Sequence, residues 1–567
     1  MKNMTRKRYA GLAAVLALIV GYGNQALALD SADHPNMQEL QRPDFLPAKP
    51  PEHFELPPVT IPAQAAPRDV PTGQVLQRVQ FHGNRVIAAE ELEKVAGPWL
   101  GKSVGVADLA SLRLELTRHY IGKGYINSGA LLASTALAEG GVVTFDIVEG
   151  RLTDIRAGGL DGLDPEYVKA KLLPDPDAAF NVDRLRENFQ LLLDDPLFTR
   201  INAQLAPGQK PGESLLNLEM QRARPYHLTV QLNNYRPSSI GEETLGVTGG
   251  VRNLTGRGDA LEGYVQKPLE GDQAYRSGFT WQMPLNYAGT GLTLQADDGE
   301  SMVIEEPLRA INIRSLLTSW EAGLSQTLLD RLNHRLAIGV NYLSRVNKTY
   351  LDGVPFSFVA GEPDGVTRAK TVKFWQEYTY RSERQVLALR STFAHTSNNL
   401  QQIAGLPTNV QPADSYSMWL GQAQYVHKLT DEGTQFITRL VVQDTSHKLL
   451  SMDGMSIGGV ATVRGFRENQ MIRDKGYVGN FELDIPVMKN SDSHSVNLIP
   501  FLDYGRGHNI GDTAQTISSG GMAVRWRWND LTLDLALARR LTKPDEMQFG
   551  KHTLQDQGIH LQLSYKM

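Results

Sequence analysis

The sequence predicts two small α+β domains followed by an all-β transmembrane barrel of about sixteen antiparallel strands. Three observations support this fold class. The chain of 567 residues opens with a leader for export, a β-α-α-β-β order occurs twice between residues 73 and 223, and apolar and polar residues alternate from residue 224 onward. Alternation of this kind is typical of strands that have one apolar and one polar face.

The first 28 residues have the three parts of a secretory signal peptide. Basic residues within positions 2–8 precede an apolar stretch over 11–20, and Ala26-Leu27-Ala28 provides a small-x-small cleavage site. The apolar stretch is shorter than the roughly 20 residues that a membrane-spanning helix needs. We therefore expect residues 1–28 to be a signal peptide, with cleavage before Leu29, and the protein to be exported.

Composition excludes several kinds of chemistry. The chain has no cysteine, so disulfides and thiolate catalysis are ruled out. Its net charge of -5 comes without a long basic run, which argues against a nucleic-acid partner. The 13 histidines form no recognisable metal-binding motif, so we expect no metal and no cofactor. A mean hydropathy of -0.30 fits a transmembrane barrel, in which only alternate residues face lipid.

Residues 29–72 are expected to form an extended linker, because prolines recur through them and such a segment cannot build a core. A short helix is possible within residues 29–42, with Pro35 at a favourable first position. The sequence leaves open whether this segment is a helix that plugs a pore or a disordered leader.

Residues 73–150 are predicted to form the first α+β domain. Leu109, Leu112, Leu116 and Tyr120 recur at helical spacing and mark the buried face of its longer helix. The predicted elements are a strand over 75–81, helices over 88–96 and 106–123, and strands over 126–132 and 142–148.

Residues 151–223 repeat this order and are predicted to form the second α+β domain. Asn181 is placed to cap the second helix of this domain. The predicted elements are a strand over 152–156, helices over 165–172 and 182–193, and a hairpin over 201–206 and 214–220.

From residue 224 to residue 567 the pattern is that of a barrel wall. Arg525 and Arg527 alternate with the apolar residues Met522, Val524, Trp526 and Trp528. In lipid, a face that carries arginine must line a lumen, and a closed barrel leaves no strand edge unpaired. At about 10 residues per tilted strand plus connections, this region accommodates on the order of sixteen strands.

Two segments of this region predict a charged contact in the lumen. The first is a glycine-flanked loop with Val463, Arg464, Gly465 and Phe466, and the second is a strand with Phe501, Asp503 and Gly505. An arginine stays charged and needs a carboxylate wherever water is scarce. Leu498, Pro500, Leu502 and Tyr504 would form the outward face of the second segment, so Asp503 should face the lumen and pair with Arg464.

These motifs resemble those of the outer-membrane transporters of two-partner secretion, which export haemolysins, filamentous haemagglutinins and contact-dependent toxins. The resemblance rests on the Arg464 loop, the strand around Glu482, the Asp503 strand, and the stretch "GYINSGALL…GGVVTFDIVEGRL". It implies that the two α+β domains are periplasmic POTRA domains. It further implies that the barrel lies in the outer membrane of a Gram-negative bacterium and exports a protein without nucleotide hydrolysis.

The resemblance also implies the partners. They are an unfolded secreted client, expected to be a large β-helical protein, the outer-membrane lipid, and the barrel-assembly machinery during biogenesis, with the transporter itself a monomeric barrel. An extended client segment can add as a strand to a domain edge. Our candidate client-binding residues are Leu109, Val143, Phe145 and Leu216.

Two other functions are compatible with a barrel that carries this loop. An insertase that assembles other barrels shares the arginine motif but would normally have more POTRA domains. A barrel that displays an enzyme or adhesin would need a further domain, and the glycine-flanked Ser456 lacks the following helix that a serine nucleophile requires. The number of domains favours a transporter over an insertase or a displayed enzyme, so we expect no enzyme activity.

Overall fold

The computed structural model describes residues 40, 44–46, 54–55, 74–133, 140–210, 212–270, 274–407, 409–491, 493–543 and 552–567. The predicted signal peptide therefore lies outside the described residues, as does nearly all of the possible plug helix over 29–42. The chain forms two compact units. Unit 1 is the barrel, with residues 226–254 and 259–567 and the N-terminal segment up to residue 48, and unit 2 comprises residues 49–225 and 255–258.

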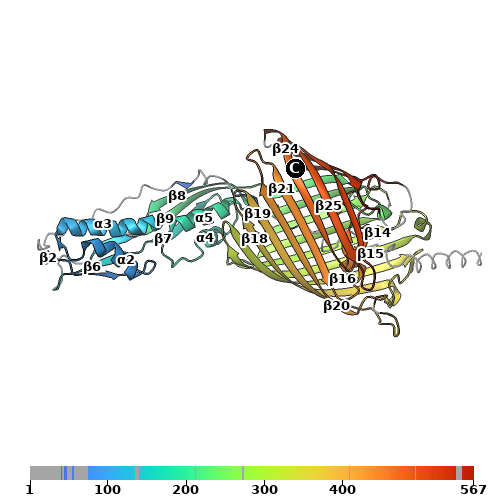
Figure 1. The fold of residues 1–567 in the computed structure, drawn as a ribbon, viewed down its shortest axis with the longest axis horizontal. Helices are drawn as coiled ribbons and strands as arrows, with labels where there is room; N and C mark the ends of the chain where they lie inside the picture. The colour runs from blue at the N-terminus through green and yellow to red at the C-terminus, as the bar shows by residue number, and fades with distance from the viewer. Residues whose placement is uncertain are drawn as a thin grey trace, which may run out of the picture. The chain divides into compact units, whose positions relative to one another are not determined.

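The first domain of unit 2 has the predicted order of elements with one addition, the short strand β4 between its two helices, which pairs with β2 (Figure 1). Its sheet has the order β3-β6-β5, with β6 in the centre. The predicted first strand is split in two, because the N–H of Gln77 donates to the carbonyl of Gly141 instead of continuing a ladder. The elements are β2 (Gln74–Val75), β3 (Arg78–His82), α2 (Ala89–Ala96), β4 (Ser103–Val104), α3 (Val106–Gly122), β5 (Gly129–Leu132) and β6 (Val142–Val148).

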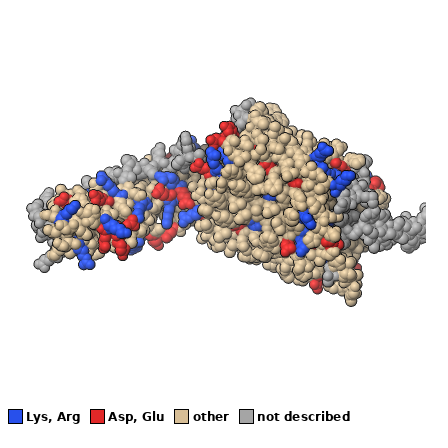
Figure 2. Space-filling model, viewed as in Figure 1, with Lys and Arg blue, Asp and Glu red and all other residues tan. Residues whose placement is uncertain are grey.

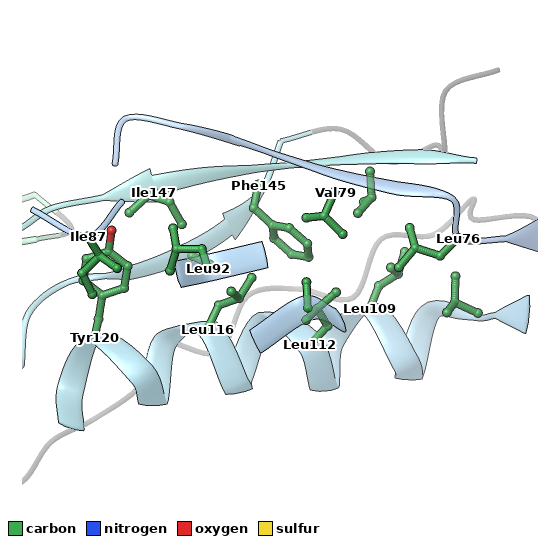
Figure 3. Close-up of a cluster of buried hydrophobic side chains, with 14 residues drawn as sticks. Leu76, Val79, Ile87, Leu92, Leu109, Leu112, Leu116, Tyr120, Phe145 and Ile147 are labelled. Atoms are coloured by element: carbon green, nitrogen blue, oxygen red, sulfur yellow. The ribbon is translucent and has the colours of Figure 1, made fainter. Parts of the chain in front are cut away.

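The core of this domain lies between α3 and the sheet. Leu112 and Leu116 of α3 point toward Phe145 of β6, and all three side chains are fully buried (Figure 3). The same face of α3 carries Leu109 and Tyr120, as the helical spacing predicts. Burying a large apolar side chain contributes about 1.5–3 kcal/mol, so this face fixes the helix on the sheet.

The second domain of unit 2 repeats the same construction. Asn181 caps α5 by accepting the N–H groups of Asp183 and Arg184, as predicted. Its sheet has the order β1-β8-β9-β7, in which the linker strand β1 (Phe54–Glu55) runs parallel to β8. The other elements are β7 (Arg151–Gly158), α4 (Pro165–Leu172), α5 (Val182–Leu193), β8 (Phe198–Pro207) and β9 (Glu213–Arg222).

Backbone hydrogen bonds join the two domains of unit 2. The N–H of Phe180 donates to the carbonyl of Gly150 at 2.7 Å, and the N–H of Val182 donates to that of Gly124 at 2.9 Å. The side chain of Asn127 donates to the carbonyl of Gly212 at 2.9 Å. The two domains therefore meet through fixed contacts, and not only through the chain connection at Gly150.

We predict that Phe145→Ala destabilises unit 2 by about 3–5 kcal/mol, because it leaves a cavity at the centre of a filled core. The described α-helices all lie in unit 2. We expect the variant to unfold at a lower urea concentration than the wild type. The measurement is urea unfolding of the detergent-solubilised protein, followed by the circular-dichroism signal of the helices. Gln80→Ala, on the exposed face of β3, is the control and should shift the transition by less than about 0.5 kcal/mol. Equal transitions for both variants would contradict this account of the core.

The barrel is a closed antiparallel sheet, in which β10 pairs with both β11 and β28. Sixteen strands form the ring, as predicted, and the two-residue β17 (Val354–Pro355) pairs with β16 beside it. The ring strands are β10 (Tyr226–Asn233), β11 (Thr244–Arg252), β12 (Ala260–Pro268), β13 (Tyr275–Pro284), β14 (Thr290–Met302), β15 (Ile313–Asp330), β16 (His334–Leu351), β18 (Val366–Arg381), β19 (Gln385–Asn398), β20 (Ser415–Lys428), β21 (Gln435–Thr445), β24 (Lys475–Ser491), β25 (His494–His508), β26 (Gln515–Trp528), β27 (Leu531–Arg540) and β28 (Ile559–Lys566).

The two ends of the barrel differ in their connections. One end has tight turns, such as residues 331–333 and 382–384, and we call it the short-turn end. The other end has the long connections 399–414, 446–474 and 541–558, and we call it the long-loop end. In outer-membrane barrels, short turns face the periplasm and long loops face the outside.

The two faces of the wall differ in charge. Figure 2 shows a wide area of the barrel surface with few charged side chains, whereas unit 2 carries them throughout. On β25, Leu502 is 49% exposed and Asp503 is 0% exposed, so alternate residues face outward and inward. Charged residues of the inward face pair across neighbouring strands, Arg276 with Asp297, Arg390 with Glu377, and Arg525 with Asp534. Lys373 of β18 pairs with Glu321 of β15 across the intervening β16.

Among the described residues, no helix combines the length and apolar character needed to cross a membrane. Nor do the described histidine, aspartate and glutamate residues form a group of three that could hold a metal ion.

Candidate functional site

The connection between β21 and β24, residues 446–474, folds back inside the barrel, and we call it the lumenal loop. Its two short strands, β22 (Met455–Ile457) and β23 (Met471–Arg473), pair antiparallel and present the segment around Arg464 at the tip. Val463 and Phe466 are both 0% exposed and pack with Ile457 and with the inward-facing Val478 of the wall. The loop therefore has its own small apolar core, and this core holds the tip in one place.

Two glycines make room for this tip. Gly465 has φ of +87°, a conformation that L side chains rarely adopt, and its N–H donates to Nε2 of His560 at 3.0 Å. A side chain at Gly505 on β25 would meet Ile457 and Val463, because a Cβ there would lie 2.4 Å from Cγ2 of Ile457. The glycines of both predicted segments are thus needed for the loop to approach the wall.

Arg464 binds two carboxylates of the barrel wall, and we call Arg464, Asp503 and Glu482 the Arg464 clamp. Nε donates to Oδ2 of Asp503 at 2.7 Å and Nη2 donates to Oδ1 at 2.8 Å, a bidentate pair. Nη1 lies 2.8 Å from Oε1 of Glu482. The guanidinium also stacks on Phe501, 3.6 Å from the ring centroid. The structure thus brings Arg464 together with Asp503, as predicted, and also with Glu482 and Phe501.

Asp503 is fully enclosed and fully paired. Besides the two guanidinium contacts, Oδ2 accepts the backbone N–H of Arg464 at 3.1 Å and Oδ1 accepts Nδ2 of Asn480 at 2.8 Å. A carboxylate has about four lone-pair sites, and here each oxygen accepts two donors. Such pairing offsets the cost of removing the charge from water.

The charges around the clamp balance. Nη1 of Arg439 on β21 donates to Oε1 of Glu482 at 3.1 Å. Arg439 and Arg464 therefore face Asp503 and Glu482, two positive groups against two negative ones. Removing any one of the four leaves an uncompensated charge where water has limited access.

A second buried ion pair fixes the start of the lumenal loop. Arg345 of β16 pairs with Asp453, and its Nη1 donates to the carbonyl of Met452 at 3.1 Å. The hydroxyl of Tyr416 on β20 donates to Oδ2 of Asp453 at 2.6 Å. Sequence reasoning missed this pair, although the alternation of Leu336, Ile338, Val340 and Tyr342 would have placed Arg345 on the inward face.

The proposed client-binding residues lie elsewhere than expected. Leu109, Val143, Phe145 and Leu216 are buried in the cores of unit 2, with at most 2% exposed. Strand β6 lies between β3 and β5, and β9 lies between β8 and β7, so neither offers a free edge. The physical reason is that burial of apolar side chains is the main favourable term in folding a small domain, so these residues face the helix–sheet cores and not the solvent.

Described residues of the N-terminal segment contact the barrel at its short-turn end. Phe45 packs against Val386, Val426 and Ile437, and the N–H of Leu46 donates to the carbonyl of Ser382 at 3.1 Å. These apolar residues have the phase of the inward face on β19, β20 and β21. The segment thus touches the inner wall at Phe45 and the 382–384 turn at Leu46.

A closed sixteen-strand barrel, a charge-paired loop inside it and two small α+β domains are the architecture of an outer-membrane barrel protein with POTRA-like domains. Comparison with protein families agrees. The model of the family described as haemolysin secretion/activation protein ShlB/FhaC/HecB matches residues 212–527, and the model of the ShlB-type POTRA domain matches residues 75–150. The chain belongs to this family of two-partner secretion transporters of the Gram-negative outer membrane, and the members of this family are transporters and not enzymes.

Similar proteins and structures are consistent with this. The chain is 22% identical over 472 residues to the outer membrane transporter CdiB of Dickeya dadantii, covering 80% of each chain. It is 26% identical over 271 residues to the heme/hemopexin transporter protein HuxB of Haemophilus influenzae, covering 45% of this chain and 46% of that one. The structure of CdiB from Escherichia coli has the same fold, with a TM-score of 0.70, 20% identity, and coverage of 90% of this chain and 94% of that chain.

We predict that Arg464→Ala and Asp503→Ala each destabilise the clamp by about 3–5 kcal/mol, because each leaves its partner charged and enclosed. Arg464→Lys should restore little, since an ammonium cannot reproduce the bidentate geometry or the stacking on Phe501. The measurements are secretion of the client, normalised to barrel level, and the temperature at which the folded barrel loses its shifted electrophoretic mobility.

The double variant Arg464→Ala/Asp503→Ala should be little worse than either single variant, because the two residues act as a pair. Arg384→Ala, which removes an exposed ion pair with Asp431 at the short-turn end, is the matched control. Strictly additive losses would show that Arg464 and Asp503 act separately.

Proposed function

We propose that this transporter captures an unfolded secreted partner with its POTRA domains and threads it through the barrel lumen to the cell surface. The observation that carries the proposal is the clamped lumenal loop inside a closed, charge-lined barrel. The client is a large protein of the haemolysin, adhesin or contact-dependent toxin class that folds into a β-helix outside. The description of the matching family, haemolysin secretion/activation protein, supports a secreted protein client.

A groove beside β7 in the second domain of unit 2 is the proposed capture site. It has a volume of about 560 Å³ and lies between the strand and α4. On the described residues, β7 pairs with β9 on one side and has no strand partner on the other. An extended client segment can add as a strand along this edge and place its side chains in the groove. The lining includes Arg151, Thr153, Ile155, Glu166, Lys169 and Leu173.

The opposite edge of the same sheet is already paired. Phe54 and Glu55 of the linker lie parallel to Ala203 and Gln204 of β8. A client would have to displace the linker to pair there, whereas the β7 edge needs no such displacement. This difference favours β7 over β8 as the first contact for the client.

Transport through the barrel requires the lumenal loop to leave its place. When the loop leaves, Arg464 goes with it, and Arg439, Glu482 and Asp503 stay on wall strands with a net charge of about -1. Water in the polar lumen must then hydrate this charge, which makes release of the loop reversible. The polar inward face suits a hydrated extended chain. Folding of the client outside supplies direction without nucleotide hydrolysis. The transporter acts as a monomeric barrel, placed in the membrane by the barrel-assembly machinery.

We predict that the client crosslinks to the β7 groove. A photo-reactive residue at Thr153 or Glu166, both exposed, should capture the client during secretion, and one at the exposed Lys94 of α2 should not. Deleting residues 75–149 should abolish secretion and leave a heat-modifiable barrel in the outer membrane. Crosslinks of equal strength at Lys94, which lies in the first domain, would contradict the β7 groove as the capture site. Normal secretion by the deletion variant would contradict a role of the first POTRA domain in capture.

We also predict that the purified protein conducts ions in planar bilayers, because its lumen is polar and charge-lined. The current should fluctuate as the lumenal loop moves. Deleting residues 29–72, which include the segment that contacts the inner wall, should raise the average current. A folded and inserted protein without any conductance, even after this deletion, would be incompatible with a transport barrel.

A further inference from the structure

A second arginine of the lumenal loop, Arg467, has partners of its own. Nε and Nη2 donate to Oδ1 and Oδ2 of Asp556, each at 2.7 Å, and Nη1 donates to Oε1 of Glu305 at 2.8 Å. The pair with Asp556 is bidentate, the strongest arrangement for these two groups. The side chains of Arg467, Asp556 and Glu305 are 12%, 3% and 17% exposed, so this contact is enclosed almost as well as that of Arg464.

The partners of Arg467 belong to loops, whereas those of Arg464 belong to strands. Glu305 lies in the connection 303–312 between β14 and β15, and Asp556 lies in the connection 541–558 between β27 and β28. Both connections are at the long-loop end of the barrel. Arg464 therefore fastens the lumenal loop to the wall, and Arg467 fastens it to loops at the mouth.

Neighbouring hydrogen bonds join these loops to a third, residues 234–243. Nε2 of Gln555 donates to the carbonyls of Asn234 and Arg236 at 2.6 and 2.7 Å. The N–H of Ile304 donates to the carbonyl of Ser239 at 2.9 Å. The N–H of Glu468, next to Arg467, donates to Oε1 of Gln555 at 2.9 Å. Three loops and the lumenal loop are thus connected around one arginine.

We propose that Arg467, Asp556 and Glu305, which we call the Arg467 clamp, hold the outer mouth of the barrel closed and separate when the client leaves. This proposal rests on the proposed transport function and adds a contact that controls opening of the outer mouth. Arg467 is a positioning residue, since it acts by holding loops together. The loops can part without breaking the strand ladder, because Glu305 and Asp556 lie outside β14, β27 and β28.

The test measures the pore without any client. Arg467→Ala removes all three contacts, and Asp556→Asn keeps the shape of that side chain while removing its charge. Both variants should raise the open probability in planar bilayers by about tenfold, which corresponds to about 1.4 kcal/mol. Cells that produce them should become more sensitive to vancomycin, a large hydrophilic antibiotic, than cells with the wild-type protein.

Arg384→Ala is the matched control, because it removes an arginine–aspartate pair at the short-turn end. It should leave the open probability and vancomycin sensitivity unchanged. Open probabilities at the wild-type level in Arg467→Ala and Asp556→Asn, or a rise of the same size in Arg384→Ala, would overturn the proposal. Heat-modifiable mobility shows that each barrel is folded, and Asp556→Asn provides the measurement if Arg467→Ala does not assemble.

This design separates the two proposals. A failure to find any exported client would overturn the proposed function and leave the measured pore closure intact. Normal export together with wild-type open probabilities in Arg467→Ala and Asp556→Asn would overturn the closure proposal alone.

Discussion

The pairing of Arg464 with Asp503 is the contact on which the inside of this barrel depends. A guanidinium cannot lose its charge, so a loop that carries it into a confined lumen must bring it to a carboxylate. Asp503 accepts four donors, Glu482 takes the remaining side of the guanidinium, and Phe501 covers its face. This pairing, together with the apolar packing of Val463 and Phe466, places the loop tip against the wall.

The lumenal loop is held at three places of different character. Its start is fixed by Asp453 with Arg345, its tip by the Arg464 clamp on the wall, and its returning part by the Arg467 clamp on the mouth loops. Hydrogen-bonded ion pairs are strong when enclosed and weak when hydrated. A loop fastened by charges in a polar lumen can thus be stable in a resting barrel and still be released when a hydrated chain enters.

The apolar residues of unit 2 serve its stability. The apolar residues that sequence reasoning assigned to client binding form its cores, and Phe145 and Leu216 lie on strands whose two edges are both paired. The places where a further strand could pair lie at the edges of the sheet. There β7 borders a groove, and β8 is already paired with the linker strand β1. The central strands have both edges paired, so another strand can add only at the edges of the sheet.

The sequence by itself determined the class of the fold, because its periods are local properties of the chain. The helical spacing of Leu109, Leu112 and Leu116 and the alternation along β25 each identify a buried face without knowledge of any partner. The same alternation turned Asp503 inward. Spacing alone would equally fit a surface arginine at Arg464, so the predicted contact depended on the resemblance of the surrounding motifs to the transporter family. Only the tertiary structure decided which further groups meet. Arg467 binds Asp556 and Glu305, which are separated from it by 89 and 162 positions in the sequence. Arg345 binds Asp453, at a separation of 108 positions. No local pattern encodes pairings over such separations. Closure of the sheet brings these loops together, so the contacts depend on strand register and loop paths around the whole ring.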